Sequence, residues 1–458
     1  MRRHDVVVVG GGAGGLTAAR EANRRGAWTV LISDGPLGGD CTHTGCVPSK
    51  ALLDAAARGQ SFAEAMATVH QRIEEVAATE DADTLVREGI AVLSGRARLT
   101  GDRGVDVDGR RIEGRHIILA TGARAAVPPI PGLREQPHLT NETIFDLDSQ
   151  PRRLAILGGG AIGVELAQAF RGLGSDVTIV EAQSRLLPVE EPEASAVIDA
   201  RFRCRGIDLR SGARVERVEP GQTGDVCLRL GDGTTVVADQ LLVATGRTPT
   251  TAGLGLADAG VEVDERGFIR TDETLATTAS GIWAIGDVTG RMPFTHAAGR
   301  MAFVAVANAL SKMPLRKARF DSRPIPWVTF TSPEVARVDM TERDAADHGG
   351  RVAFLPLSEV DRGRITGDID GFVKLIAGPR RLLGNVGGGR LLGATIVAPT
   401  AGEMIGQVAL AMRTNMFTGR LAQATQAYPT WSMGIQETAT QFFMTQRGHT
   451  ARDARPHP

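Results

Sequence analysis

The sequence predicts an α/β fold of two domains built on βαβ units, followed by a C-terminal α+β domain. Three observations lead to this prediction. A glycine-rich turn at residues 10–15 follows a run of valines, and a second turn with the same glycine spacing lies at residues 158–163. Beyond residue 321 short strands and helices follow in an order different from the strand–glycine turn–helix pattern before it. Glycine turns between a strand and a helix are typical of Rossmann-like dinucleotide-binding domains.

The first glycine turn has G-x-G-x-x-G spacing. Residues 5–9 (DVVVV) read as a buried parallel strand, residues 16–25 as a helix, and residues 28–32 as the next strand. In such a unit the first glycine makes the turn, the second admits a pyrophosphate and the third lets helix pack on strand. Ser33 stands where an acid usually ends the second strand, and an aspartate follows it. The cofactor contacts predicted here are Gly10, Gly12, Gly15 and Asp34.

The second glycine turn repeats the pattern and adds an acid. The strand after it, DVTIVE, ends in Glu181. A carboxylate at this place accepts hydrogen bonds from both ribose hydroxyls and repels a 2′-phosphate, which favours NADH over NADPH. Arg185 lies close by and leaves NADPH possible. The contacts predicted here are Gly158, Gly160, Gly163 and Glu181.

The segment GGDCTHTGCVPSK, residues 38–50, holds two of the four cysteines. A regular helix would separate Cys41 from Cys46 by about 7.5 Å of axial rise. A disulfide needs Cα atoms about 4.4–6.8 Å apart. If the two cysteines bridge, the helix must therefore be broken between them, and Gly45 supplies the slack. A close cysteine pair in a long chain with few cysteines indicates cytosolic redox chemistry.

Composition excludes several classes of partner. The formal net charge is −1, which gives no general attraction to nucleic acid or to an anionic membrane. No apolar run approaches the length of a membrane span. Nothing around Cys204 or Cys227 has metal-ligand spacing, so these two are expected to be buried structural thiols and no metal site is predicted. We expect a cytoplasmic protein.

Four motifs together resemble the pyridine nucleotide-disulfide oxidoreductases, whose members include glutathione reductase, dihydrolipoamide dehydrogenase and mercuric reductase. They are the cysteine segment, GGGAIGVELA at 158–167, ATGRTP at 244–249 and GIWAIGDV at 281–288. Their order and spacing extend the resemblance from residue 5 to about residue 445. The resemblance implies FAD in the first nucleotide site and NAD(P)H in the second. It also implies a homodimer whose C-terminal domain completes the partner's active site.

The resemblance also implies roles for single residues. Cys46 would lie next to the flavin and Cys41 would meet the substrate, by thiol–disulfide exchange. Lys50 would lie near the flavin ring, with Glu165 as its ion-pair partner. Asp287 would hydrogen-bond the ribityl chain. The remaining cofactor contacts implied are Gly39, Thr121, Gly122, Gly246, Arg247 and Gly286, with Arg247 along the nicotinamide-side cleft.

Five segments are expected from these assignments. Residues 1–145 form the first part of the FAD-binding domain and residues 251–320 its return segment. Residues 146–250 form the NAD(P)H-binding domain and residues 321–446 the C-terminal dimerisation domain. Residues 447–458 are expected to be a disordered tail.

The C-terminal domain departs from the disulfide reductases. Those enzymes carry a histidine and a glutamate that move protons to and from the substrate dithiol. Here Tyr428 stands in the place of the histidine and Met433 about where the glutamate should be. A phenol is a poor base at pH 7. A tyrosine resembles mercuric reductase, but no cysteine follows Cys227 to deliver Hg(II).

The expected function is that of a mercuric reductase-like flavoenzyme. Electrons pass from the nicotinamide through FAD to the Cys41–Cys46 disulfide, and on to a metal ion, a disulfide or a quinone-type acceptor. Two alternatives stay open: a redox-sensing regulatory flavoprotein, and an NADH oxidase or diaphorase whose cysteines do not turn over.

Overall fold

The chain divides into two compact units, each built from two separate segments. The computed structural model describes residues 3–101, 103–222, 224–312 and 316–456. The first unit comprises Met1–Pro151 and Gln240–Asp321, and the second comprises Arg152–Asp239 and Ser322–Pro458. The predicted α/β class is confirmed in both units.

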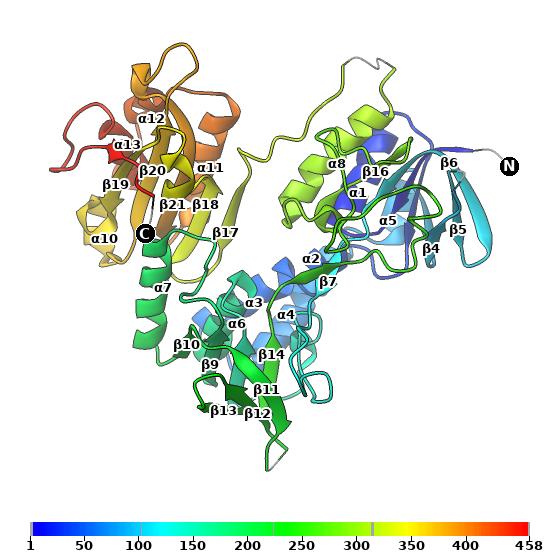
Figure 1. Cartoon of the computed structure of the whole chain (residues 1–458), viewed down its shortest axis with the longest axis horizontal. Helices are drawn as coiled ribbons and strands as arrows, with labels where there is room; N and C mark the ends of the chain where they lie inside the picture. The colour runs from blue at the N-terminus through cyan, green and yellow to red at the C-terminus, as the bar shows by residue number, and fades with distance from the viewer. Residues whose placement is uncertain (1–2, 102, 223, 313–315, 457–458) are drawn as a thin grey trace. The chain divides into compact units, whose positions relative to one another are not determined.

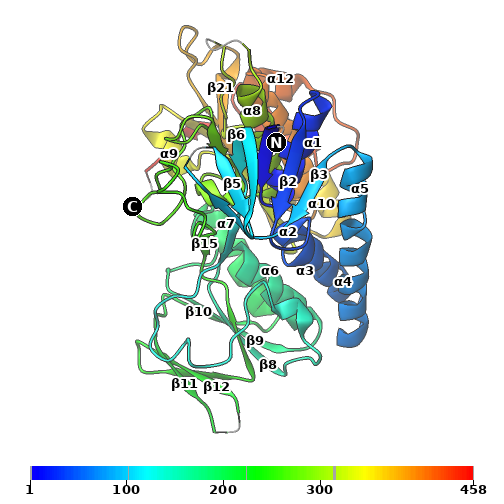
Figure 2. The ribbon, with the colours of Figure 1, turned by 90° about the vertical axis from the view of Figure 1, so that its right-hand side faces the viewer.

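The first unit is built on one sheet (Figures 1 and 2). Its strand order is β3-β2-β1-β6-β5-β4, and β16 also pairs with β6. The strands β1, β2, β3, β6 and β16 run parallel to one another, with Val7 of β1 opposite both Val30 and Ile117. Strand β5 pairs antiparallel with β6 and with β4. The strand bounds are β1 His4–Val9, β2 Thr29–Ser33, β3 Ala91–Ser94, β4 Ala97–Leu99, β5 Gly104–Val107, β6 Arg110–Leu119 and β16 Ile282–Ala284.

The central strand β1 is buried because its sequence is almost all valine. Val6, Val7 and Val8 are fully buried, as expected for a parallel strand covered on both faces. Helix α1 (Ala13–Arg24) follows the first glycine turn and packs against α8 (Thr295–Ala309). The return segment therefore supplies both the seventh strand, β16, and a covering helix.

Three helices lie between Cys46 and Arg87. They are α3 (Cys46–Ala57), which begins inside the cysteine segment, α4 (Phe62–Ala77) and α5 (Ala82–Arg87). A capping box between Ser61 and Glu64 starts α4. Helices α3 and α4 pack side by side (Figure 2).

Short elements complete the first unit. Strand β7 pairs antiparallel with β15, which joins the turn after β6 to the ATGRTP motif. The bounds are β7 Ala123–Ala125, η1 Ile144–Asp146, β14 Gln240–Val243, β15 Arg247–Pro249 and η2 Gly286–Thr289.

The second unit begins with another βαβ unit. Its parallel strands follow the order β10-β9-β8, with Leu154 opposite Val177. The bounds are β8 Arg153–Leu157, α6 Ala161–Gly172, β9 Asp176–Glu181, α7 Pro192–Cys204 and β10 Asp208–Ser211. An antiparallel sheet comes next, made of β11 Val215–Pro220, β12 Val226–Leu230 and β13 Thr235–Ala238.

The C-terminal part of the second unit is an antiparallel sheet covered by helices (Figure 1). Its strand order is β17-β18-β21-β20-β19-β22. The core lies where α11 packs on β18 and β21 and includes Ala336, Ile396 and Ile405. The strand bounds are β17 Pro326–Thr329, β18 Glu334–Asp339, β19 Arg351–Pro356, β20 Phe372–Gly378, β21 Arg390–Ala398 and β22 Arg452–Asp453. The helix bounds are α9 Glu342–Ala346, η3 Leu357–Glu359, α10 Asp361–Thr366, η4 Val386–Gly388, α11 Ala401–Arg413, α12 Thr418–Gln423 and α13 Met433–Thr440.

The predicted disordered tail at 447–458 is wrong for the described residues 447–456. Strand β22 pairs with the edge strand β19. The Ala454 N–H donates to Gly350 O at 2.8 Å, and Arg452 pairs with the buried Glu342. An edge strand offers unpaired backbone groups to any segment that reaches it. Residues 457 and 458 lie outside the described residues.

Candidate functional site

The first glycine turn has the geometry that a pyrophosphate needs. Gly10 has φ +112°, in the region that favours glycine. A Cβ on Gly15 would overlap the carbonyl oxygen of Gly10, so helix and turn touch through backbone alone. A Cβ on Gly12 would meet nothing closer than 3.9 Å. The face at Gly12 is therefore open, beside the N-terminus of α1, where a phosphate is favoured.

The cysteine segment lies directly on this turn. The Gly38 N–H donates to Gly11 O at 2.9 Å, and Gly38 forms a β-bridge with Gly12. A Cβ on Gly39 would lie 2.7 Å from the Cα of Gly12, which explains why glycine stands there. The sequence could not predict this contact, because the two segments are separated by a helix and a strand.

The helix breaks between the cysteines, as predicted for a pair that can bridge. Cys41 lies in the short helix α2 (Gly39–His43), and Cys46 begins α3. Gly45 between them has φ −126° and ψ −110°, and its Cβ would lie 3.3 Å from the Cα of Cys41. Both cysteines are thiols in this structure, and their side chains are hydrogen-bonded to one another. The Sγ of Cys46 also lies 3.6 Å from Thr295 Oγ1.

The two thiols are not equivalent. The hydrogen bond to Cys46 raises the pKa of the Cys41 thiol, and burial and the carboxylate of Glu80 add to the rise. Glu80 is held in place because Thr42 Oγ1 donates to it at 2.9 Å. Cys41 therefore holds its proton at neutral pH. Sequence reasoning missed Glu80, which follows α4 and carries no motif.

Sequence reasoning also missed the charge cluster around Asp40, the residue that precedes Cys41. Asp40 ion-pairs with Arg247 and accepts hydrogen bonds from Thr44 Oγ1 and, at 3.2 Å, from Asn141 Nδ2. The Nε of Arg247 lies 3.5 Å from the carboxylate of Asp287. Burial raises the pKa of Asp287, and Arg247 opposes this rise. The guanidinium of Arg247 thus lies between two carboxylates of the first unit, a setting that the motif did not indicate.

The turn after β6 is joined to the segment after β15. Thr121 Oγ1 donates to Thr250 O at 2.7 Å, and the Thr250 N–H donates to Gly122 O at 3.0 Å. Gly122 and Gly246 have positive φ, and a Cβ on either would meet open space. Gly286, also at positive φ, precedes Asp287 in η2. The turns at Gly122 and Gly246 and the residue Asp287 thus lie in segments of the first unit that contact one another.

Asp34 is the least engaged of the predicted residues in the first unit. It is exposed beyond the end of β2. Ser33, at the strand end, is buried, and its hydroxyl donates to Gly35 O at 3.0 Å. The predicted ribose contact of Asp34 stays a prediction.

Lys50 and Glu165 lie on α3 of the first unit and α6 of the second, respectively. The Nζ of Lys50 donates to Ser49 Oγ at 3.4 Å. The side chain of Glu165 is 4% exposed, and its Oε1 accepts the N–H of Phe330 at 2.8 Å. The predicted pairing of Lys50 with Glu165 stays a prediction.

The second glycine turn repeats the first in detail. Gly158 has φ +113°, a Cβ on Gly163 would overlap the carbonyl oxygen of Gly158, and a Cβ on Gly160 would meet nothing within 4 Å. At the end of β9, Glu181 accepts the N–H groups of Gly159 at 2.6 Å and Gln183 at 2.7 Å. The carboxylate is thus held beside the turn.

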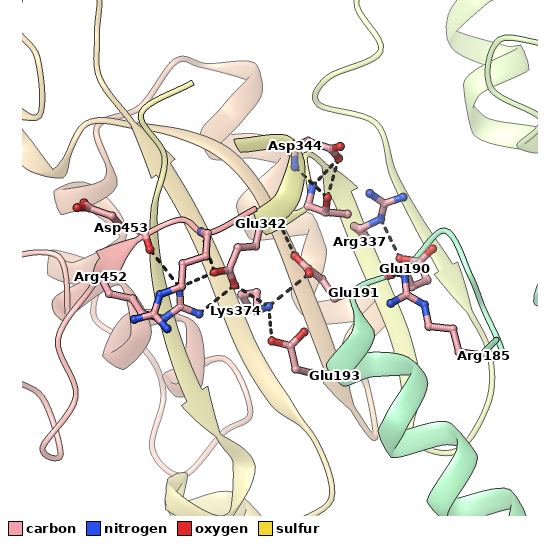
Figure 3. Close-up of polar contacts among 12 residues, drawn as sticks. Arg185, Glu190, Glu191, Glu193, Arg337, Glu342, Asp344, Lys374, Arg452 and Asp453 are labelled. Carbon is pink, nitrogen blue, oxygen red and sulfur yellow. Dashed lines mark hydrogen bonds and ion pairs between the residues drawn. The ribbon is translucent and has the colours of Figure 1, made fainter. Parts of the chain in front are cut away.

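Arg185 is engaged with its own loop. Its Nη2 donates to the carbonyl oxygens of Pro188 and Glu190, each at 2.9 Å. Figure 3 shows Arg185 beside Glu190. The guanidinium therefore stabilises the loop after β9. This is a different task from binding a 2′-phosphate, for which the sequence had left room.

The remaining predicted residues lie outside the two turns. Tyr428 is 67% exposed and precedes Pro429 in a cis peptide, and Met433 begins α13. The prediction that Cys204 and Cys227 are buried is wrong: Cys204 is exposed and Cys227 is half-buried.

Neither a metal cluster nor a membrane span is present in the described part of the chain. The described residues contain no group of three His, Cys, Asp or Glu side chains placed to hold a metal ion. Among the same residues no helix is both long and apolar enough to cross a membrane.

Two glycine turns and a cysteine pair on one of them define a class of redox protein with two nucleotide sites. The model of the pyridine nucleotide-disulphide oxidoreductases matches residues 4–302, and the model of their dimerisation domain matches residues 325–439. The chain belongs to the pyridine nucleotide-disulphide oxidoreductase family, as the sequence motifs predicted.

Relatives agree with this assignment. The chain is 33% identical to a mercuric reductase of Staphylococcus aureus, over 96% of this chain and 82% of the relative. It is 36% identical to a dihydrolipoyl dehydrogenase of Chlorobaculum tepidum, over 95% and 96%. Among solved structures, a Cu(II) complex of the HOCl-induced flavoprotein disulfide reductase RclA from Escherichia coli has a TM-score of 0.86 at 31% identity, covering 96% of this chain and 99% of that chain.

These findings establish the reaction class. The chain is a flavoprotein disulfide oxidoreductase with FAD and a pyridine nucleotide as cofactors, and its dimerisation domain supports a homodimer.

Proposed function

We propose that the protein is an NADH-dependent flavoenzyme that reduces a thiophilic metal ion, such as Hg(II) or Cu(II), at the Cys41–Cys46 pair. One observation carries the choice of acceptor: Tyr428 and Met433 stand where the disulfide reductases carry the histidine and glutamate that move protons to and from a substrate dithiol. Attack on a disulfide requires a thiolate, which a base must generate when the thiol pKa is raised. A soft metal ion needs no such base, because coordination itself deprotonates the thiol.

The residues of the first unit fit a bound FAD. The open face at Gly12 and the N-terminus of α1 would hold its pyrophosphate, and Asp287 would hold its ribityl chain. When bound, FAD supplies the chemistry that links hydride donation by a nicotinamide to reduction of a disulfide. Further contacts are assigned to the remaining predicted positions, Gly10, Gly15, Asp34, Gly39, Lys50, Thr121, Gly122, Gly246, Arg247 and Gly286.

The second glycine turn would bind the nicotinamide nucleotide. Gly160 leaves room for the pyrophosphate, and Glu181 would accept hydrogen bonds from the ribose hydroxyls. Arg185 gives two hydrogen bonds to loop carbonyls, which supports NADH over NADPH. Glu165, with Lys50, would control access of the nicotinamide.

The remaining roles, binding the metal ion and donating a hydrogen bond near it, are assigned to the two cysteines and to the C-terminal domain. Cys41 would bind the metal ion first, and Cys46 would share it. Tyr428 of the partner subunit would donate a hydrogen bond near this site, as the dimerisation domain of the family implies. Mercuric reductases and a Cu(II)-bound disulfide reductase among the similar proteins support a metal-ion acceptor. A close cysteine pair in a long chain with only four cysteines supports a cytoplasmic location.

An acceptor screen tests the proposal. Purified FAD-loaded protein is mixed with NADH and, in turn, Hg(II), Cu(II), glutathione disulfide, lipoamide or a soluble quinone, and NADH oxidation is followed. We expect turnover with at least one metal ion and a loss of about a hundredfold or more in Cys41→Ser and Cys46→Ser. The matched control is Cys204→Ser, which removes an exposed thiol on α7.

Two results would contradict the proposal. Faster turnover with glutathione disulfide or lipoamide than with any metal ion would make the acceptor a disulfide. Equal turnover in the wild type and in Cys41→Ser would mean that the thiols take no part, as in a diaphorase.

A further inference from the structure

The loop that follows Glu181 is held at both ends. This β9–α7 loop comprises residues 182–191. At its start Glu181 accepts the N–H of Gln183, and further along the Leu187 N–H donates to Gly159 O at 2.8 Å. The first half of the loop is thus fixed to the second glycine turn. Its other end leads into α7 and carries two consecutive glutamates.

The first of these, Glu190, is bound by the C-terminal sheet. Arg337 Nε on β18 lies 2.8 Å from Glu190 Oε2 (Figure 3). Trp327 Nε1 on β17 donates to Glu190 Oε1 at 2.8 Å. The guanidinium of Arg337 also lies over the Trp327 ring, 4.3 Å from its centroid. Both carboxylate oxygens of Glu190 are therefore used, and all three side chains are largely buried or half-buried.

The second, Glu191, enters a buried cluster around Lys374. Lys374 and Glu191 are each 0% exposed, and their charged groups lie 3.4 Å apart. The N–H of Glu342, at the start of α9, donates to Glu191 Oε1 at 2.7 Å. Lys374 Nζ also lies 2.6 Å from Glu193 and 3.2 Å from Glu342 (Figure 3). One of the few lysines in the chain thus joins α7 to β20 and α9.

The C-terminal segment adds the second cation. Arg452 on β22 pairs with both carboxylate oxygens of Glu342, and the Arg455 N–H donates to the same carboxylate at 3.2 Å. Burial would raise the pKa of Glu342, but Arg452 and Lys374 outweigh it and lower the pKa to about 2. The segment predicted to be disordered therefore neutralises a buried acid.

Such pairs fix positions more than they add stability. Buried charges need good geometry with several partners, and breaking one pair leaves an uncompensated charge. Glu190 and Glu191 can therefore occupy only the places that Arg337 and Lys374 define. Because Arg185 ties Glu190 back to the middle of the loop, the position of the whole loop depends on these two cations.

We infer that the C-terminal domain positions the nucleotide-selecting carboxylate Glu181 through the β9–α7 loop, with Arg337 and Lys374 as positioning residues for NADH. This inference rests on the proposed function, in which Glu181 binds the ribose. It assigns to the C-terminal domain a task within its own subunit, in addition to dimerisation.

Equilibrium binding of ADP-ribose to the FAD-loaded protein tests the inference. ADP-ribose carries the adenine ribose that Glu181 would hold, and it transfers no hydride, so the measurement is independent of the acceptor. We expect Arg337→Gln to weaken binding about tenfold, because a small displacement of a binding group costs much affinity. Arg337→Lys, which keeps the charge, should restore part of the loss. Hydrogen exchange of residues 182–191 should become faster in Arg337→Gln.

The matched control is Arg447→Gln. Arg447 also bridges two carboxylates of the C-terminal domain, Glu437 and Asp361, and neither of these belongs to the β9–α7 loop. We expect this variant to lower the melting temperature while ADP-ribose binding stays within about twofold of wild type. If Arg337→Gln does not fold, Arg452→Gln replaces it, with an expected loss of about threefold.

Two negative results are distinguishable. If wild-type protein binds ADP-ribose and the tested variant binds it within twofold of wild type, the positioning role is wrong while the nucleotide site stands. If wild-type protein does not bind ADP-ribose at all, the proposed nicotinamide site is wrong, and the inference falls with it.

Discussion

The two glycine turns of the chain are nearly identical in backbone and differ in the segments that come after them. Gly10 and Gly158 have φ +112° and +113°, and in both turns the third glycine touches the carbonyl oxygen of the first. A Cβ on the middle glycine would meet nothing closer than 3.9 Å in either turn. This shared geometry makes room for a pyrophosphate in either turn but does not select a nucleotide.

The strand ends supply the difference. After the first turn, β2 ends in the buried Ser33, whose hydroxyl is turned to its own loop. After the second turn, β9 ends in Glu181, whose carboxylate holds the turn and the next loop together. The first turn is instead covered by the cysteine segment. Each turn therefore admits a dinucleotide, while its neighbours decide which one binds and which reaction takes place.

The largest effect is expected from filling the glycine contacts. In Gly15→Ala the new methyl group would overlap Gly10 O, and overpacking of this kind costs about 1–3 kcal/mol or more. We expect Gly15→Ala to lose most bound FAD. Gly163→Ala should keep FAD but lose NADH-dependent turnover. The absorbance ratio of flavin to protein and the rate of NADH oxidation measure the two effects.

Matched glycines control for helix effects. Gly299 in α8 and Gly406 in α11 have no close neighbour at the Cβ position, so Gly→Ala there should keep FAD and stabilise the helix by about 0.5–1 kcal/mol. Full FAD content in Gly15→Ala would contradict the assignment of FAD to the first turn.

The second-largest effect is expected from replacing the residue at the end of β9 with the residue that ends β2. Glu181→Ser gives the second turn the residue of the first, and removes the acceptor for Gly159 and Gln183. We expect kcat/KM for NADH to fall about tenfold or more and the preference over NADPH to shrink, because the repulsion of a 2′-phosphate is lost. Steady-state rates with both nucleotides measure the change. Asp34→Ser, at the first turn, should leave the ratio unchanged, and a shift there equal to that of Glu181→Ser would refute the assignment.

Much of the site could be predicted from the sequence, and the reason is local. The glycine roles and the helix break at Gly45 depend on contacts within a few residues or within one βαβ unit, which spacing predicts. Arg247 shows what sequence patterns do not predict. The motif picked out Arg247, which begins β15, but its partners Asp40 and Asp287 come from distant segments whose approach no pattern records. The prediction for Arg452 failed for a related reason, since a polar tail has no periodicity that reveals a buried partner.

A smaller effect concerns the thiols beside the first turn. The pKa of Cys41 is raised chiefly by its hydrogen bond to Cys46, so the thiolate fraction at neutral pH is low. In reduced wild-type protein, alkylation of Cys41 by iodoacetamide should therefore be slow and should still accelerate above about pH 9. In Cys46→Ser the main cause of the rise is gone, and alkylation at about pH 8 should be about fivefold faster. Mass spectrometry of the labelled peptide measures both rates, with Cys204 as the exposed reference thiol. Equal rates for Cys41 and Cys204 would contradict the asymmetry.

The smallest effect is expected at Tyr428, which belongs to neither turn. Its phenol replaces a family histidine whose proton transfer a metal-ion acceptor does not need, so Tyr428→Phe should lower turnover with the metal ion only about threefold, through loss of one hydrogen bond. Tyr428→His should not create efficient reduction of glutathione disulfide, because the histidine would still lack the glutamate that Met433 replaces.

The double variant Tyr428→His with Met433→Glu is the stronger test of the missing proton relay. A gain of about tenfold in disulfide reduction with the double variant, and little with either single variant, would show that the two positions act as one unit. A large loss of metal-ion turnover in Tyr428→Phe would instead mean that the phenol takes part in the reaction. The proposal that Tyr428 only donates a hydrogen bond, while the two thiols bind the metal ion, would then be wrong.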